Sequence, residues 1–117
     1  YEGLKKILQT IADLGKGSFL TVLKLYGKAN KNWLSFPLEG YSLSLDFKID
    51  KGLLELLNQL DKIVLKYHGR IYLTKDARVS KETFEQGYPD IEKFRQYRKE
   101  YGMSEKFQSL QSKRVGI

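Results

Sequence analysis

The spacing of apolar residues predicts four helices along the chain. Apolar residues at three- and four-residue intervals indicate an amphipathic helix that ends at Gly15. A second, stronger pattern predicts a helix over 51–67, with Asp50 as its N-cap and Gly69 after its end. Ser80 is a typical cap for a brief helix through Gln86, and a last amphipathic stripe runs over 91–101. Residues 102–117 lack a useful apolar period and are expected to form an irregular tail.

Three shorter segments have the composition of β-strands. Residues 18–26 are rich in β-branched and aromatic side chains, and both faces of this strand are largely apolar, so we expect it to be covered on both sides. Residues 41–47 alternate strictly, which predicts a strand with one packed face and one polar face, paired antiparallel with the first. Residues 70–73 are expected to form a short third strand.

This order of elements predicts an α+β fold with a small, mainly antiparallel sheet and helices packed on it. The most favoured wiring is a split βαβ arrangement, as in half of a ferredoxin-like fold. The length of 117 residues fits a single domain.

Composition removes several classes of chemistry. The chain has no cysteine and only one histidine, His68, which excludes thiolate catalysis and disfavours zinc or triad chemistry; no metal site is expected. The lack of cysteine fits a reducing compartment, so a cytoplasmic protein is expected, with membrane association left open. The net charge of +7 raises the possibility of an anionic partner, but the favoured interpretation is a face solvated by lysines, because the lysines are scattered along every element.

Candidate chemistry lies on the predicted strands. Lys24 interrupts an apolar strand face and is expected at an edge, beside a carboxylate such as Asp46, or facing a ligand cavity. Ser42 and Ser44 lie on the polar face of the next strand, which is either solvated or joins Lys24 in a wall of hydroxyl and amine groups suited to sugar-like substrates.

The segment after the second long helix carries further polar groups. Tyr72 and Lys75 lie three residues apart, so they converge only if the strand ends near Leu73 and the chain bends. Asp76, with Arg78 and Lys81, could equally be a surface charge cluster. Two loop aromatics, Trp33 and Phe36, are expected either in the core or in an apolar lid or lipid-facing patch.

Several blocks of the sequence resemble the carboxy-terminal substrate domain of FAD-linked oxidases of the vanillyl-alcohol-oxidase type. These oxidases include the aldonolactone oxidases and, nearest in pattern, the decaprenylphosphoryl-ribose 2-oxidase group. The blocks keep their order and spacing from about residue 18 to the end; they are residues 19–24, 34–41, 45–47, 69–78, Phe84, Tyr88-Pro89, Phe94 and 107–114. Ser42 and Ser44 replace the asparagine and cysteine of mycobacterial relatives, and the usual Asp-Pro is missing after Tyr101.

The resemblance implies a two-domain flavoprotein in which an upstream domain holds FAD and this chain, as a substrate or cap domain, covers the flavin. It implies that the fragment binds no FAD and is inactive alone, and that the complete protein oxidises a sugar-like alcohol, including a lipid-linked one. The resemblance makes Lys24 and Lys75 catalytic, with Lys75 near the flavin. The implied substrate-binding residues are Tyr72, Ser42, Ser44 and Tyr26.

Two alternatives from other classes remain. One is a basic α+β module that binds an anionic polymer or a membrane surface. Nucleic acid is disfavoured as its partner because the basic and aromatic strand signature of RNA-recognition modules is missing. The other is a purely structural interaction domain, which an exposed Lys24 far from Lys75 would favour.

Overall fold

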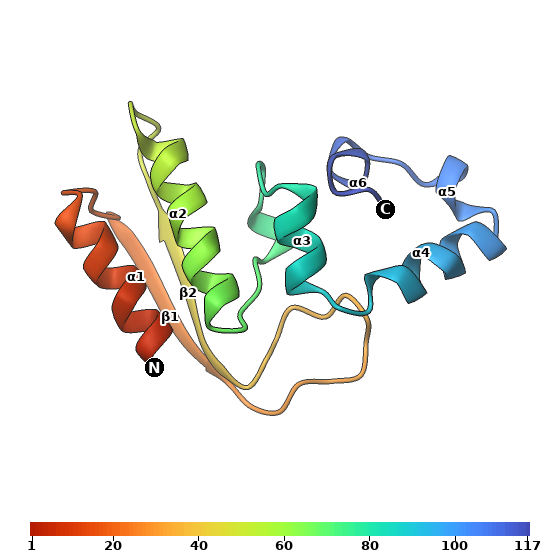
Figure 1. The fold of residues 1–117 in the computed structure, drawn as a ribbon, viewed down its shortest axis with the longest axis horizontal. Coiled ribbons are helices and arrows are strands. Elements are labelled where there is room, and N and C mark those ends of the chain that lie inside the picture. The colour runs from red at the N-terminus through yellow and green to blue at the C-terminus, as the bar shows by residue number, and fades with distance from the viewer. The chain divides into compact units, whose positions relative to one another are not determined.

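The computed structural model describes all residues from Tyr1 to Ile117. The chain forms two compact units, one of residues 1–30 and 37–69, the other of residues 31–36 and 70–117. Helices and a two-stranded antiparallel sheet make up the structure, which confirms the α+β class (Figure 1). The assignment of the chain to a single domain stays a prediction.

The first unit contains two helices and both strands. Helix α1 (Glu2–Asp13) is followed by β1 (Leu20–Tyr26), β2 (Gly40–Asp46) and α2 (Leu53–Lys66). Helix α1 ends as predicted, because Gly15 adopts a left-handed conformation with φ of 62°. The N-cap of α2 is Gly52 rather than the predicted Asp50, whose carboxylate instead pairs with Lys16 Nζ at 2.5 Å.

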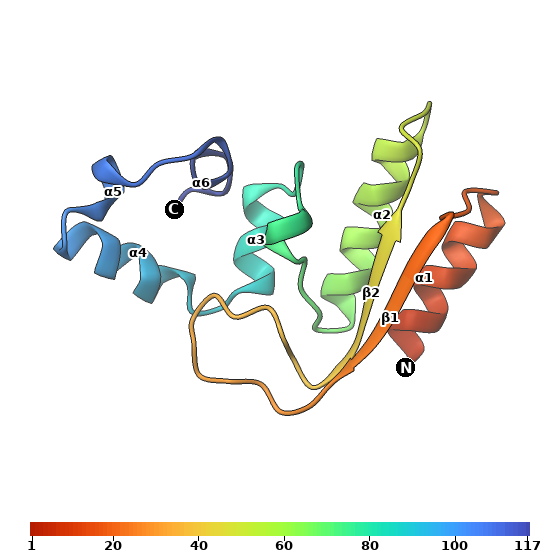
Figure 2. The same cartoon turned by 180° about the vertical axis from the view of Figure 1, so that it is seen from behind.

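The strands pair antiparallel, as expected, with Leu20 opposite Asp46 and Tyr26 opposite Gly40. Leu45 and Phe47 of the second strand segment pack on a core formed by Ile11, Leu56 and Leu60 of α1 and α2. Because side chains alternate along a strand, the odd-numbered positions face the helices and the even-numbered positions face away. Figure 2 looks onto this second face, which no element of the unit covers.

The expectation that the first strand is covered on both sides was wrong. Leu23 is 53% exposed and Leu25 is 71% exposed, although both lie on the helix side of the sheet, and Val22 on the other side is 41% exposed. The two helices bury side chains of β2 rather than β1, and the sheet has no third strand to flank β1. One edge strand of this unit therefore presents apolar groups to solvent.

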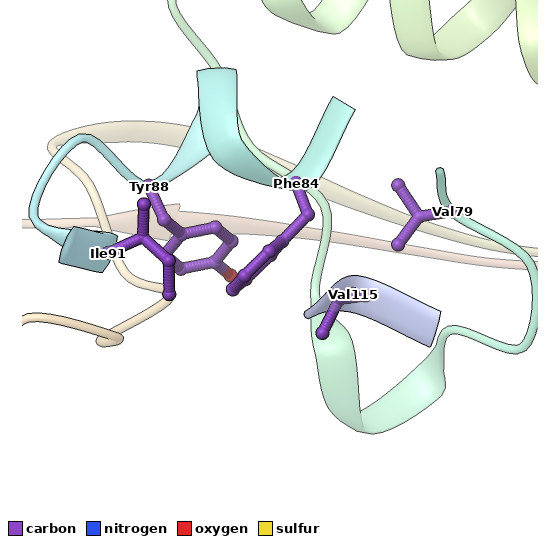
Figure 3. Packing of buried hydrophobic residues seen from close by; sticks show 5 residues of the cluster. All are labelled: Val79, Phe84, Tyr88, Ile91 and Val115. Carbon is purple, nitrogen blue, oxygen red and sulfur yellow. The ribbon is translucent and has the colours of Figure 1, made fainter. Parts of the chain in front are cut away.

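The second unit is helical. It contains a 3-10 helix (Leu73–Lys75), α3 (Lys81–Gly87), α4 (Ile91–Glu100), α5 (Met103–Lys106) and α6 (Leu110–Val115). Ser80 caps α3 as predicted, because its hydroxyl accepts a hydrogen bond from the Thr83 N–H at 3.1 Å. The buried hydrophobic side chains of this unit gather around α3 (Figure 3), and they are Val79, Phe84, Tyr88, Ile91 and Val115.

Two predictions for this unit were wrong. Residues 70–73 form no strand; the chain is extended at Tyr72 and then tightens into the 3-10 helix, so the sheet lacks the third strand of the expected βαβ wiring. The tail after residue 102 is not irregular throughout. Helix α6 is too short for an apolar period, but Ser109 and Ser112 form a capping box and Gly116 ends the helix with φ of 72°.

Candidate functional site

Four of the predicted site residues lie on the open face of the two-stranded sheet. Lys24 stands directly opposite Ser42, and Ser44 stands opposite Val22 on the same face. Tyr26 follows Lys24 by two residues and therefore points to that face as well. Directly opposed side chains in an antiparallel pair begin about 4.5–5.5 Å apart, close enough for the ammonium and the hydroxyl to bind one ligand group together.

Lys24 lies on an exposed edge strand and not beside a carboxylate. The side chain is exposed, so the ammonium pays no large desolvation cost, and the partner across the sheet is Ser42 rather than Asp46. Ser42, Ser44 and Tyr26 are each half-buried. An amine, two hydroxyls and a phenol on one open surface can donate to and accept from a polyhydroxylated ligand.

Tyr72 and Lys75 lie at the two ends of a hydrogen-bonded turn, without the strand that the sequence predicted before it. The backbone N–H of Lys75 donates to the carbonyl of Tyr72 at 3.1 Å, which closes a 3-10 turn. Tyr72 itself has an extended backbone, with φ of −78° and ψ of 105°, and both side chains are exposed. The ring of Phe36 packs on Tyr72 with centroids 4.6 Å apart, so this loop aromatic steadies the phenol.

Asp76 is a buried structural carboxylate and not part of a surface cluster, because its side chain is only 3% exposed. Its Oδ1 accepts hydrogen bonds from the backbone N–H groups of Arg78 and Val79 at 2.9 and 2.8 Å. Its Oδ2 lies 2.7 Å from Arg114 Nη2. Burial alone raises the pKa of the Asp76 carboxyl, but these hydrogen bonds and the guanidinium outweigh burial and hold the pKa below its usual range.

Tyr88 supports the beginning of the same segment. Its hydroxyl donates to the carbonyl of Ile71 at 2.8 Å, and the Arg70 guanidinium lies 4.8 Å from its ring centroid. Arg70 in turn donates to the carbonyl of Ser35 at 2.8 Å. Burial in the core raises the pKa of the Tyr88 phenol to about 12, because it disfavours the charged phenolate.

An open hollow of about 470 Å³ in the second unit contains none of the predicted site residues. Trp33 lines it and contacts Tyr97 edge-on, with ring centroids 5.9 Å apart. The sequence interpretation missed Arg114, Gln111 and Phe36 as neighbours of the Tyr72–Lys75 turn. Only Phe36 gave a signal in the sequence, as an aromatic residue in a polar loop. Arg114 and Gln111 gave none, because contacts between distant parts of the chain leave no periodic pattern.

The structure therefore defines a small α+β protein whose candidate groups are lysine ammonium, serine hydroxyl and tyrosine phenol. This set suits binding of a hydroxylated or anionic ligand. No helix in the structure has the length and apolar character needed to cross a membrane.

Comparison with known proteins agrees with the resemblance found in the sequence. The chain is 39% identical over 116 residues, 99% of its length, to the decaprenylphosphoryl-beta-D-ribose oxidase of Mycolicibacterium smegmatis. It is also 35% identical over 115 residues to a Streptomyces coelicolor protein described as an uncharacterized protein in the mprA 5'region. No family model matches the chain. The resemblance to the oxidase group is confirmed, and the chain spans about a quarter (25%) of the first relative and 31% of the second.

Proposed function

We propose that this chain is the substrate-facing part of an FAD-dependent oxidoreductase that oxidises a sugar-like alcohol. The observation that supports this most strongly is the 39% identity to an oxidase of a lipid-linked ribose across nearly the whole chain. The substrate class is an aldonolactone or, more closely, a polyprenyl-phospho-pentose. The complete polypeptide would add a flavin-binding portion, without which this chain would be inactive.

The residues present fit the substrate side of a flavin site and not the holding of the cofactor itself. The chain contains no glycine-rich loop of the kind that cradles a dinucleotide pyrophosphate. Its lysines, by contrast, would suit the negative charge that develops on a reduced flavin. When bound by the rest of the protein, FAD would accept the hydride from the carbinol carbon of the sugar.

Each candidate residue has a role that its position supports. Lys24, exposed and opposite Ser42, would orient a sugar hydroxyl, and the serine would accept or donate the second hydrogen bond. Ser44 and Tyr26 would extend this surface and contact the substrate. Lys75 would stabilise negative charge near the flavin and Tyr72, in the same turn, would hydrogen-bond the substrate.

Anaerobic flavin reduction tests this proposal. The complete polypeptide, with its flavin bound, is mixed with a polyprenyl-phospho-ribose or with an aldonolactone, and the visible absorbance of oxidised flavin is followed. We expect one substrate class to bleach the flavin and a matched sugar lacking the reacting hydroxyl to leave it unchanged. A flavin that neither class reduces, or a complete polypeptide that binds no flavin, would contradict the proposal.

A basic surface-binding module is the second candidate, and the charge of the second unit favours it. Residues 31–36 and 70–117 carry twelve lysines and arginines against seven aspartates and glutamates, a net charge of +5. Binding of the chain to anionic vesicles or nucleic acid that weakens steeply with added salt, in a complete polypeptide that holds no flavin, would favour this function over the oxidase.

A further inference from the structure

The segment of residues 70–79 has little regular structure of its own. Beyond a single 3-10 turn it forms neither helix nor strand, so its backbone polar groups need partners from elsewhere in the fold. Gln111 of α6 supplies two of them. Its side-chain Nε2 donates to the carbonyl of Leu73 at 2.6 Å and lies 3.3 Å from the carbonyl of Asp76. These two carbonyls flank Lys75 on both sides.

Arg114, one turn further along α6, holds the end of the segment. Its Nη2 reaches Asp76 Oδ2 at 2.7 Å, and its Nη1 donates to the carbonyl of Val79 at 2.5 Å. The planar guanidinium makes both contacts at once in a fixed geometry, which an ammonium cannot do. The segment is therefore attached to α6 on either side of its exposed residues.

Helix α6 is itself firmly anchored. Val115 is fully buried in the core of this unit, and its neighbours there include Val79 and Phe84 (Figure 3). The Arg95 side chain donates through Nε to the carbonyl of Gly116 at 2.7 Å. Arg95 is paired with Glu85 at 2.6 Å, so α6 is connected through it to α3 and α4. A residue held by α6 is thus held by the packed part of the unit.

We propose that Gln111 and Arg114 are positioning residues that fix the turn carrying Tyr72 and Lys75. The inference rests on the proposed function for the role of that turn in catalysis. Neither positioning residue contacts the substrate; both act through the backbone of residues 73–79 and through Asp76. Their effect is to keep the Lys75 ammonium and the Tyr72 phenol in one orientation while both side chains remain exposed.

Hydrogen exchange followed by mass spectrometry tests the attachment in the complete polypeptide. The variant Arg114→Gln removes the guanidinium, and Lys113→Gln is a matched control with the same charge change on an exposed neighbour. We expect amides of residues 73–79 to exchange at least about tenfold faster in Arg114→Gln, because a charge-assisted contact to a buried group is lost. Exchange in Lys113→Gln and in helix α2 should stay as in the unchanged chain.

A second variant keeps the inference falsifiable if Arg114→Gln fails to fold. Asp76→Asn keeps the size of the side chain and Oδ1 but loses the ion pair, and we expect the same peptide to exchange faster. Adding Asp76→Asn to Arg114→Gln should accelerate exchange little further, since Arg114→Gln already removes the ion pair that Asp76→Asn removes. Unchanged exchange in both single variants, or equal acceleration in Lys113→Gln, would overturn the inference.

Flavin reduction in the complete polypeptide separates this inference from the proposed function. We expect Arg114→Gln to lower the limiting rate constant for substrate-dependent flavin reduction by about tenfold with unchanged flavin content. The control variant Lys113→Gln, with the same change of charge on an exposed neighbour, should leave this rate constant unchanged. Faster exchange of residues 73–79 with an unaltered reduction rate would confirm the attachment to α6 and refute the role proposed for Lys75 and Tyr72.

Discussion

Replacing Tyr88 by phenylalanine removes one hydroxyl from the core of the second unit and tests how that core supports the Tyr72–Lys75 turn. The hydroxyl donates to the Ile71 carbonyl at 2.8 Å, and the side chain is only 1% exposed. Without it, the carbonyl loses a buried partner. We therefore expect the free energy of unfolding to fall by about 1–3 kcal/mol at neutral pH, although the ring still fills the same space.

The same substitution has a distinct signature at alkaline pH. The Tyr88 pKa is about 12 in the folded protein and about 10 in the unfolded chain. Because the folded-state pKa is raised, the contribution of Tyr88 to stability is complete below about pH 10 and is lost as the pH rises through about 12. At about pH 11 the loss amounts to about 1.4 kcal/mol, since one pKa unit corresponds to about 1.4 kcal/mol.

Urea denaturation of both proteins at about pH 8 and about pH 11 measures this difference. All other tyrosines and lysines are common to the two proteins, so the difference between them isolates Tyr88. The stability advantage of the unchanged chain over Tyr88→Phe should shrink by about 1.4 kcal/mol at the higher pH. An advantage that stays constant, or grows, would refute the view that Tyr88 is buried as a neutral hydrogen-bond donor.

Three further changes test the packing around the candidate site. Asp76→Asn should make the stability of the fold less sensitive to acid. The pKa of Asp76 is lowered in the folded protein, so its carboxylate stabilises the fold above about pH 4 and this contribution is lost as the pH falls. The urea midpoint of the unchanged chain should therefore drop more steeply from about pH 6 to about pH 3 than that of the variant. Val115→Ala should lower the free energy of unfolding by about 2–3 kcal/mol, measured by thermal unfolding, because Val115 is fully buried. Leu110→Ala should lower it by less than about 0.5 kcal/mol, because the Leu110 side chain is 89% exposed. Similar losses in the two variants would show that α6 is not packed through Val115. Gly69→Ala would place a Cβ 2.9 Å from the Val64 Cγ1 and should lower the free energy of unfolding by about 1–3 kcal/mol. The added Cβ of Gly17→Ala meets nothing within 4 Å, so this variant is the control. Equal denaturation midpoints for the two variants would contradict the close approach at the end of α2.

The elements predicted best from the sequence were those with a long or strict period. The apolar stripe of α2 and the alternation at residues 41–47 each produced the element that the structure contains. The same alternation left a solvated serine face and a face shared with Lys24 as alternatives, and the register of the strands, with Lys24 opposite Ser42, places the two residues on one face. These features depend on local spacing, which a single sequence records directly.

The missed features depend on contacts between distant residues. Residues 70–73 have the β-branched and aromatic composition of a strand, but no neighbouring strand pairs with them, and the carbonyl groups of Ile71 and Leu73 bond instead to the side chains of Tyr88 and Gln111. Helix α6 has only six residues, too few for a period, and forms because its ends are capped and Val115 is buried. The partners of Asp76 could not be inferred, since Arg114 lies 38 residues away.

Anaerobic flavin reduction measures whether the ammonium groups of Lys24 and Lys75 act on the substrate and the flavin. In the complete polypeptide, Lys24→Met and Lys75→Met are compared with Lys28→Met and Lys113→Met, which remove the same charge from exposed positions outside the proposed site. We expect the limiting rate constant of flavin reduction to fall by about a hundredfold or more in the first two variants, with flavin still bound, and to change little in the controls. Reduction of the flavin at an undiminished rate in both Lys24→Met and Lys75→Met would contradict the roles proposed for the two lysines.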